Sequence, residues 1–496
     1  MIGAAGETRL PSPASARVRE LALALALLVL AFSAFSLSQR RQLGLLGGLT
    51  DEWDLLGANL AVHGTIGLEN EPWLLRPPGY PAFIAVPLLV AGPPRVITDA
   101  YLERAAPVLY SAQALALAAA SVLLFLWLAQ TIPWPQAFAA GLFLGVNPLS
   151  LTLVGLRQYP ALHVLALVAG LWALDHAVGW WPDRRAPMAL AGVVWGLATL
   201  VRPVTLLLPP FVFVLLLLRR PRSGLRSVGV ATIVFCLAMA AAIAPWTARN
   251  WAVSGRFVPV NLQGWANVWA ATLRPLPVVP DSYRWFALGP DILRVHLGVT
   301  GQPEYDLVTY VKFNAETEEA YRAEALTNLR QRPAVYLGNV SRSFRSLVLD
   351  TNTVYLRLFR YVQKTDATVR QTWFEPGRGP RLGSEGLGRA FGSLAAMLGV
   401  LSAVGMIVGL HSRQGPLFTT TLVAGCFLVA HSIAHMEFTY LYVKLPFLSV
   451  LAFVPLGLLR QRTSDGVPSR LSRAVDALTA ALAASVIALT ILLLRP

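Results

Sequence analysis

The sequence is poor in charged residues and in cysteine. Only 14% of its 496 residues are charged, 55% are hydrophobic and the mean hydropathy is +0.56, whereas soluble globular domains carry about 25% charged residues. These values exclude an ordinary soluble enzyme and a disordered protein, and they predict a polytopic membrane protein. The two cysteines, Cys236 and Cys426, lie in apolar runs, so we expect neither a disulfide nor a cysteine metal site.

Acidic residues and lysines are also scarce. The chain has 41 basic and 26 acidic residues, a formal charge of +15, and only three of the basic residues are lysines. In a soluble protein this excess would suggest nucleic acid, but here its placement between apolar runs indicates membrane topology, so we expect no nucleic-acid partner. A Gly-rich phosphate loop, a nucleophile elbow and a dinucleotide fingerprint are absent, which argues against nucleotide-driven chemistry.

Eleven apolar runs predict an all-α fold with about eleven transmembrane helices. A bilayer core about 30 Å thick needs roughly 20 apolar residues in a helix. Two of the runs are separated only by Arg202-Pro203, which predicts two short helices that turn at this dipeptide. The expected spans are 21–38, 105–129, 136–156, 160–178, 186–201, 203–218, 227–246, 390–410, 414–434, 442–459 and 475–494.

The arginines set the expected orientation. Segment 80–94 is uncharged but short and rich in proline. If it is not counted as a span, the Arg-rich connections lie on the same side as the Arg-rich N-terminus, and by the positive-inside rule that side is the cytoplasm. We therefore expect an interfacial helix at 80–94 and a multi-pass protein of the cytoplasmic (inner) membrane with a cytoplasmic N-terminus.

This topology divides the chain into three parts. They are an N-terminal transmembrane module (1–246) whose first outer loop (39–104) holds interfacial helices, a large mixed extracytoplasmic loop domain (247–388), and C-terminal transmembrane helices (389–496). In the large loop, the spacing of Tyr321, Ala325 and Leu329 predicts a helix with a Glu318–Arg322 pair alongside.

Acidic residues cluster just beyond the first apolar run, in Thr50-Asp51-Glu52-Trp53-Asp54. They could begin a helix, with Thr50 as its cap and the carboxylates at the positive end of the helix dipole. They could also supply a general base at the outer membrane boundary. The two roles are compatible, because a cap can position a base.

Arginines recur at the same expected level of the membrane. Arg202 lies in the tightest outward turn, on the side that the charge bias avoids, and Arg157 and Arg249 have comparable positions. Several guanidinium groups at one level suit a phosphate, which each can bind through two parallel hydrogen bonds. Arg76 could equally extend to lipid head groups.

The last outward turn carries further polar residues. His431 and His435 are four residues apart with Glu437 near, but the His-Glu-x-x-His pattern is absent and we expect no metal site. Lys444 either forms a structural ion pair near Glu437 or makes another phosphate contact.

Taken together, these blocks resemble the bacterial family-39-like members of the GT-C glycosyltransferases, a group that includes protein O-mannosyltransferases and the aminoarabinose transferase that modifies lipid A. The blocks occur in order over about four fifths of the chain. They are Asp51-Glu52-Trp53 with Ala58-Asn59-Leu60, Arg76-Pro77-Pro78-Gly79-Tyr80-Pro81, Leu200-Val201-Arg202-Pro203, Pro245-Trp246-Thr247-Ala248-Arg249-Asn250 with Gly255-Arg256-Phe257-Val258-Pro259-Val260, the loop helix 319–333, and Tyr442-Val443-Lys444-Leu445-Pro446.

The resemblance implies a bacterial cell-envelope enzyme that moves a sugar, a hexosyl or pentosyl unit, from a polyprenyl-phosphate carrier to an acceptor on the outer face of the membrane. Direct displacement predicts inversion at the anomeric carbon. The departing lipid phosphate is a stable anion that needs only positive charge, so we expect no cofactor. The expected catalytic residues are Asp51, as base, and Glu52; the expected substrate- and phosphate-binding residues are Arg76, Tyr80, Arg202, Arg249, Lys444 and Glu437.

Two departures from the family pattern bear on the acceptor side of the reaction. Tyr159 stands where an acid often precedes the proline that starts the fourth span, and Leu441-Tyr442 replaces a common Arg-Tyr. The acceptor class (protein, lipid or polysaccharide) and the oligomeric state stay open.

Two other functions stay open as well. A transporter or lipid flippase would use the charges to line a path, but the acidic cluster, the large loop and the lack of an inverted repeat count against it. A glycan ligase or polymerase would move an oligosaccharide in place of one sugar.

Overall fold

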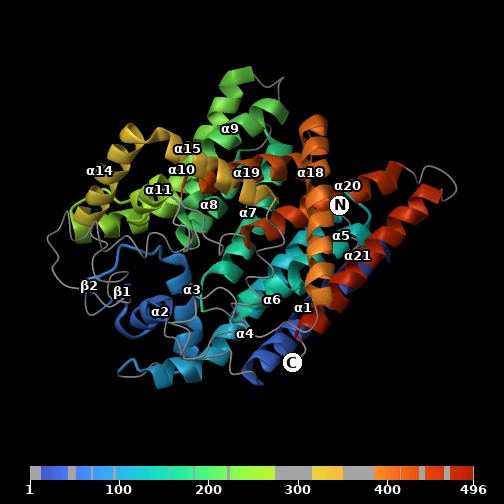
Figure 1. The fold of residues 1–496 in the computed structure, drawn as a ribbon, viewed down its shortest axis with the longest axis horizontal. Coiled ribbons are helices and arrows are strands. Elements are labelled where there is room, and N and C mark those ends of the chain that lie inside the picture. Colours follow the sequence, from blue (N-terminus) through green and yellow to red (C-terminus); the bar gives the residue numbers. More distant parts are fainter. Residues whose placement is uncertain are drawn as a thin grey trace, which may run out of the picture.

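The computed structural model describes residues 13–42, 52–68, 71–92, 96–155, 157–182, 185–219, 224–273, 315–349, 385–413, 415–434, 442–462 and 470–494. Almost all of these residues are helical, and the helices form a bundle (Figure 1). Asp51, His435 and Glu437 lie outside the described residues.

Each of the eleven expected spans coincides with one helix or with two consecutive ones, which confirms the prediction of an all-α polytopic membrane protein. Among the described residues, seven helices (α1, α4, α7, α10, α19, α20 and α21) are long and apolar enough to cross a membrane, and shorter apolar helices accompany them. The bundle comprises α1 (Pro13–Gln42), α4 (Asp99–Leu128), α5 (Trp134–Val146), α6 (Pro148–Val154), α7 (Pro160–Trp180), α8 (Ala186–Val201), the 3-10 helix η1 (Pro203–Leu207), α9 (Leu208–Arg219), α10 (Gly224–Ser254), α18 (Glu385–Ser412), α19 (Gly415–Ile433), α20 (Lys444–Arg462) and α21 (Arg470–Leu494).

The expected span 136–156 is broken into α5 and α6. Asn147 leaves the helical conformation, and its side chain accepts from the backbone N–H of Ser150 at 3.0 Å while donating to the Phe143 carbonyl oxygen at 2.6 Å. Pro148 follows and lacks an N–H group for the helical ladder. The predicted break at Arg202-Pro203, in contrast, is confirmed, because α8 ends at Val201 and η1 begins at Pro203.

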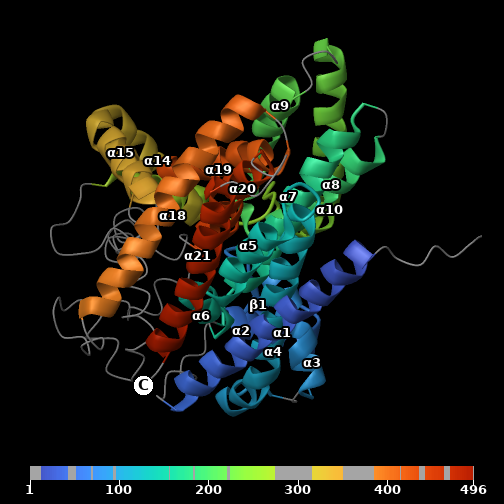
Figure 2. The ribbon, with the colours of Figure 1, turned by 90° about the vertical axis from the view of Figure 1, so that its right-hand side faces the viewer.

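The two ends of the bundle differ in what they carry. We call the end with α2 (Glu52–His63), α3 (Gly79–Val90) and the beginning of α7 the site end. The opposite end, where α9 and α20 end, is the far end (Figure 2). The connections that are expected to be cytoplasmic meet at the far end. Arg17 near the start of α1 lies over the ring of Trp134 at 4.7 Å, Arg460 at the end of α20 pairs with Asp476 of α21, and Trp181 after α7 donates to Ser227 of α10.

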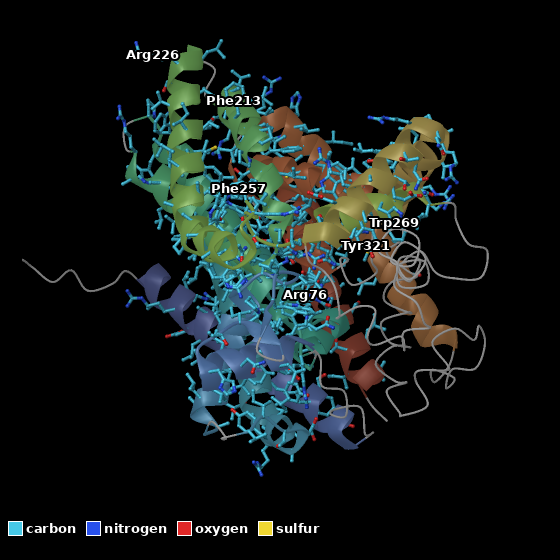
Figure 3. All side chains as sticks on the ribbon, turned by 90° about the vertical axis from the view of Figure 1, so that its left-hand side faces the viewer. Arg76, Phe213, Arg226, Phe257, Trp269 and Tyr321 are labelled. Atoms are coloured by element: carbon cyan, nitrogen blue, oxygen red, sulfur yellow. The ribbon has the colours of Figure 1, made fainter. Side chains whose placement is uncertain are left out.

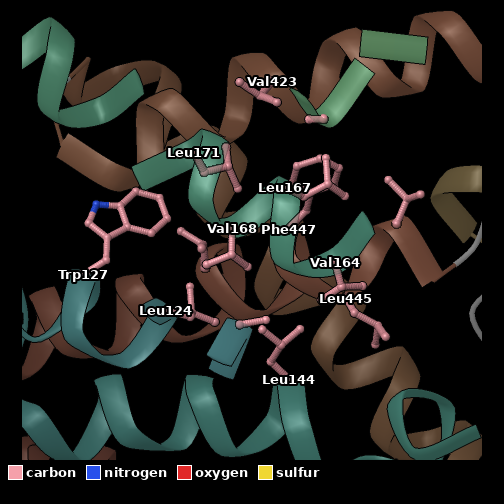
Figure 4. Close-up of a cluster of buried hydrophobic side chains, with 14 of the residues drawn as sticks. Leu124, Trp127, Leu144, Val164, Leu167, Val168, Leu171, Val423, Leu445 and Phe447 are labelled. Atoms are coloured by element: carbon pink, nitrogen blue, oxygen red, sulfur yellow. The ribbon is translucent and has the colours of Figure 1, made fainter. Parts of the chain in front are cut away.

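Close packing of small and apolar residues holds the helices together. Figure 4 shows the centre of the core, where Leu124 of α4, Leu144 of α5, Val164 of α7 and Leu445 of α20 come together. A side chain at Gly196 of α8 would place its Cβ 2.8 Å from the Met239 carbonyl oxygen of α10. Small residues allow such backbone approach between membrane helices.

The first loop folds onto the site end. It contains α2 (Glu52–His63), a short antiparallel ribbon of β1 (Gly67–Leu68) and β2 (Glu71–Pro72), and α3 (Gly79–Val90). Three large apolar side chains of α3 are exposed, those of Val86, Leu89 and Val90, as suits a helix at a membrane boundary.

The described part of the large loop contains three helices of its own, of which the first two pack on the first loop and the third packs against α19. They are α11 (Gly264–Thr272), α14 (Ala315–Gln331) and α15 (Pro333–Leu349). A second apolar cluster joins Leu75 of the first loop to Trp269 of α11 and Tyr321 of α14. The predicted loop helix is therefore present, but Glu318 accepts from the backbone N–H of Trp265 at 2.7 Å instead of pairing with Arg322, which lies over the Trp265 ring.

Candidate functional site

Trp53 is the centre of the site. Glu52 is the first residue of α2, so the acidic cluster begins a helix and carries Trp53 into the protein, where the ring is 4% exposed. The ring centroid lies 5.6 Å from that of Tyr80 and 5.3 Å from that of Tyr159, and the guanidinium of Arg76 lies 5.2 Å from it. Trp53 thus joins three segments that are distant in sequence.

Arg202 also contacts Tyr159. The residue follows α8 in an extended conformation, and its Nη1 donates to the hydroxyl of Tyr159 while the guanidinium carbon lies 4.8 Å above the phenol ring. Stacking of this kind uses the face of a guanidinium and leaves its N–H edge for hydrogen bonds. Tyr159, which sequence analysis marked only as a departure, is therefore the residue that joins Trp53 to Arg202.

A buried hydrogen bond continues this cluster. The Tyr442 ring lies 6.1 Å from that of Tyr159, and its hydroxyl is 2.8 Å from Nδ1 of His163, which is fully buried in α7. His431, near the end of α19, is also buried and is close enough to interact electrostatically with both Arg202 and His163. His163 could have been noticed as a polar residue four positions into an apolar run.

A glycine sets the distance between the Arg76 turn and Arg202. A Cβ at Gly79 would lie 2.7 Å from the Leu200 carbonyl oxygen and 2.8 Å from the Val201 side chain. The motif that begins at Arg76 therefore contacts the end of α8 directly, and the missing side chain permits this approach.

Asp54 is committed to an ion pair. Its carboxylate lies 3.2 Å from Nη1 of Arg157, whose Nη2 is 2.6 Å from Glu103 and whose Nε donates to the hydroxyl of Tyr110. Burial lowers the pKa of Arg157, but Asp54, Tyr110 and Glu103 together raise it above its ordinary value. Arg157 is thus a charged anchor of α2. Glu103 lies just before the apolar run 105–129, and its side chain is 45% exposed.

Arg249 holds the first loop in place. It lies in the last turns of α10, which extends beyond the expected span, and its guanidinium donates to the carbonyl oxygens of Trp73 at 3.1 Å and Ile66 at 2.7 Å. The same group lies 4.6 Å from the centroid of the Trp246 ring. In this arrangement Arg249 fixes the chain on both sides of the β1–β2 ribbon; its predicted contact with a phosphate stays a prediction.

The remaining predicted residues have different surroundings. Tyr80 is fully buried and donates from its hydroxyl to Gln113 at 3.3 Å. Lys444 is half-buried and is the first residue of α20, two positions after Tyr442. The side chain of Glu52, like Asp51 and Glu437, lies outside what the structure describes. Within the described part of the chain, no group of His, Cys, Asp and Glu is suited to a metal ion.

Comparison with known proteins bears on the fold. Neither a protein-family model nor a curated protein matches the sequence. Among solved structures, the archaeal oligosaccharyltransferase AglB from Archaeoglobus fulgidus, in complex with an inhibitory peptide and a dolichol-phosphate, matches over 95% of this chain and 55% of its own, with a TM-score of 0.53 and 14% identity. The chain therefore shares its fold with this oligosaccharyltransferase, which agrees with the fold expected from the resemblance to GT-C glycosyltransferases.

A second structure of the Archaeoglobus fulgidus oligosaccharyltransferase, with Zn and sulfate, gives a TM-score of 0.52 at 12% identity over 93% of this chain and 52% of that one. The chain thus spans about half the length of the oligosaccharyltransferases it matches. ArnT from Cupriavidus metallidurans bound to undecaprenyl phosphate covers 89% of this chain at a TM-score of 0.37, from which we draw no argument.

Proposed function

We propose that this protein is a glycosyltransferase that takes a sugar from a polyprenyl-phosphate carrier and transfers it to an acceptor at the outer face of the membrane. The observation that carries the proposal is the convergence of Trp53, Tyr159, Arg202 and Tyr442, from four separate segments, at one end of a GT-C fold. The likeness to an enzyme whose structure holds dolichol-phosphate supports a donor linked to a lipid phosphate.

In the proposed mechanism, Asp51 removes the proton of an acceptor hydroxyl, whose oxygen attacks the anomeric carbon and displaces the lipid phosphate with inversion. Asp51 directly precedes α2 and is two residues from Trp53. Arg202, with Arg76 and Lys444, stabilises the negative charge of the departing phosphate. The scheme contains no metal step.

The topology completes the proposal. The site end lies outside the cytoplasm, and the far end, with its Arg-rich connections, faces the cytoplasm together with the N-terminus. The transmembrane module 1–246, the loop domain 247–388 and the C-terminal helices 389–496 then act as one unit, with the loop domain over the site.

The test is release of polyprenyl phosphate by the purified protein in lipid vesicles. Because the fold likeness is with an oligosaccharyltransferase, the donor panel contains both monosaccharides and oligosaccharides on polyprenyl carriers. The Asp51→Asn variant should lose a factor of about 10²–10⁴ in turnover, the range expected for a general base. Glu319→Gln, an exposed acid on α14, is the matched control.

Two results would count against the proposal at different levels. Near-normal turnover by Asp51→Asn would remove Asp51 from the mechanism. If the wild-type protein released no polyprenyl phosphate from any donor, and a deletion strain had unchanged surface glycans by mass spectrometry, the proposed activity would be wrong.

A further inference from the structure

Helix α11 lacks a cap of its own. Gln263 occupies the N-cap position, but its side chain makes no capping hydrogen bond. The cap comes from another helix, because the carboxylate of Glu318 in α14 accepts from the backbone N–H of Trp265 at 2.7 Å. The carboxylate also lies close to Gly264, the first residue of α11, because a Cβ at that position would be in ordinary van der Waals contact with the Glu318 Oε1 atom at 3.8 Å.

The side chain of Gln263 contacts the site. Its Oε1 atom accepts from Nη1 of Arg76 at 3.4 Å. The residues just before α11 are also bound to the chain that leads into Arg76, because the N–H of Leu262 donates to the Leu74 carbonyl oxygen at 2.9 Å and the amide of Asn261 donates to that of Leu75 at 2.8 Å. The beginning of α11 therefore contacts both Arg76 and the residues just before it.

The apolar cluster around Leu75 holds α14 against α11. Trp269 of α11 and Tyr321 of α14 have ring centroids 5.0 Å apart, and both side chains are nearly fully buried with Leu75. Tyr321 is one helical turn after Glu318. In Figure 3, Trp269 and Tyr321 lie together beside the part of the chain that carries Arg76. The apolar packing of Tyr321 and the capping by Glu318 thus both join α14 to α11.

We propose that Glu318 is a positioning residue for the active site: by capping α11 from α14, it holds Gln263 against Arg76 and thereby keeps Arg76 over Trp53. The docking of the large loop would then set the donor-binding geometry. One part of this inference rests on the proposed function, namely that Arg76 contacts the donor phosphate. The positioning of Arg76 by Glu318 does not depend on it.

The neighbouring acid provides a matched control. Glu319 pairs with Arg256 at 2.6 Å on the surface, where the two side chains are 66% and 46% exposed. The experiment compares Glu318→Ala, Glu318→Gln and Glu319→Ala in the full-length protein. Glutamine keeps a carbonyl oxygen for the Trp265 N–H, so it should rescue what alanine loses.

The first two readouts need no enzymatic turnover. Loss of a cap should raise hydrogen exchange of the first α11 amides about fivefold in Glu318→Ala, and Arg76 should react faster with an arginine-selective dicarbonyl, as measured by peptide mass spectrometry. Glu318→Gln and Glu319→Ala should behave like the wild type. If Glu318→Ala matches Glu319→Ala in both readouts, the inference is wrong even if the enzyme transfers sugar.

The third readout is kinetic. Glu318→Ala should raise the donor KM severalfold and should lower kcat by a smaller factor. The Glu318→Ala/Arg76→Ala double variant should lose no more kcat/KM than Arg76→Ala alone, because both changes act through the contact between Gln263 and Arg76. Additive losses would overturn the coupling.

A variant at Gln263, which contacts Arg76 directly, tests the inference if Glu318→Ala does not fold. Gln263→Ala should raise the labelling of Arg76 while the α11 amides exchange as in the wild type. Unchanged labelling in this variant would overturn the inference, and it would do so whether or not the protein is a glycosyltransferase.

Discussion

Arg202 and Arg219 stand at the two ends of the same helical segment, η1 with α9, and both contact α7 or the residue before it. At the far end, Nη1 of Arg219 lies 2.6 Å from the Asp175 carboxylate, and the two side chains are 13% and 11% exposed. At the site end, Arg202 contacts the hydroxyl and the ring of Tyr159. In the contacts that the structure describes, Arg219 thus meets an acid and Arg202 meets a phenol.

The difference separates a structural use of charge from a binding use. Asp175 also accepts from Thr419 of α19 and from Trp127 of α4, so the far-end pair ties four segments together. Tyr159 holds its arginine by stacking and a hydrogen bond and adds no negative charge of its own. A guanidinium held in this way suits an anionic ligand, as the proposed lipid phosphate requires.

The largest effect is expected from breaking the far-end pair. Asp175→Asn leaves the largely buried Arg219 without its acid. This change should reduce the free energy of unfolding by up to about 3–5 kcal/mol, measured by denaturant titration in detergent. Asp476→Asn, which breaks the more exposed pair with Arg460, should cost clearly less. Equal losses would show that burial of the pair at Asp175 is unimportant.

A smaller loss should follow when α3 is moved away from α8. In Gly79→Ala the new methyl group meets the Leu200 carbonyl, and such overpacking costs about 1–3 kcal/mol. Turnover should fall as well, because the Arg76 turn moves relative to Arg202. Gly229→Ala in α10, where no atom lies within 4 Å of the new Cβ, is the control and should leave both stability and turnover unchanged.

Placing an acid beside Arg202, as Asp175 lies beside Arg219, tests the comparison between the two arginines. Tyr159→Glu and Tyr159→Gln both remove the ring, but only glutamate places a negative charge beside Arg202. We expect Tyr159→Glu to bind polyprenyl phosphate about tenfold more weakly than Tyr159→Gln, since a charged hydrogen bond of ordinary strength is lost to the new acid. Equal affinities in a binding titration would contradict the role given to Arg202.

The smallest effect is a dependence of loop docking on pH. Burial raises the pKa of Glu318, and hydrogen bonds from the backbone N–H groups of Trp265 and Ala266 lower it only in part. A carboxyl group whose folded-state pKa is raised adds stability below its unfolded pKa, and this stability is lost as the pH rises through the folded pKa.

Protection of the first α11 amides, corrected for intrinsic exchange rates, should therefore increase modestly from pH about 8 to about 5. Glu318→Gln should abolish the change. The other charged or titratable groups near this carboxyl are Tyr321 and Arg322 of α14 and the Arg256–Glu319 pair, so a change that persists in Glu318→Gln would assign the dependence to one of them.

Much of the fold could be predicted from local patterns. Apolar runs predicted the membrane helices, and Arg202-Pro203 predicted the turn between α8 and η1, because both depend on residues that are adjacent in sequence. The break at Asn147 was missed, although the following proline was a local signal.

The site was only partly predictable, since its contacts join distant segments. Arg76 and Arg202 were expected there, but the phenol that lies under Arg202 comes from position 159, and the cap of α11 comes from position 318. No spacing rule relates these positions. Asp175 carried a usable signal, because an acid within an apolar run is costly and is often functional or paired.

Binding of polyprenyl monophosphate to the protein in nanodiscs of zwitterionic lipid tests the central claim most directly. Arg202→Gln removes the guanidinium at the site end, and Arg226→Gln removes an exposed one at the far end, well away from Arg76 (Figure 3). We predict that Arg202→Gln raises the Kd by at least about tenfold and that Arg226→Gln leaves it unchanged. An unchanged Kd for Arg202→Gln, or an equal loss for both variants, would contradict a lipid-phosphate site at this end of the bundle.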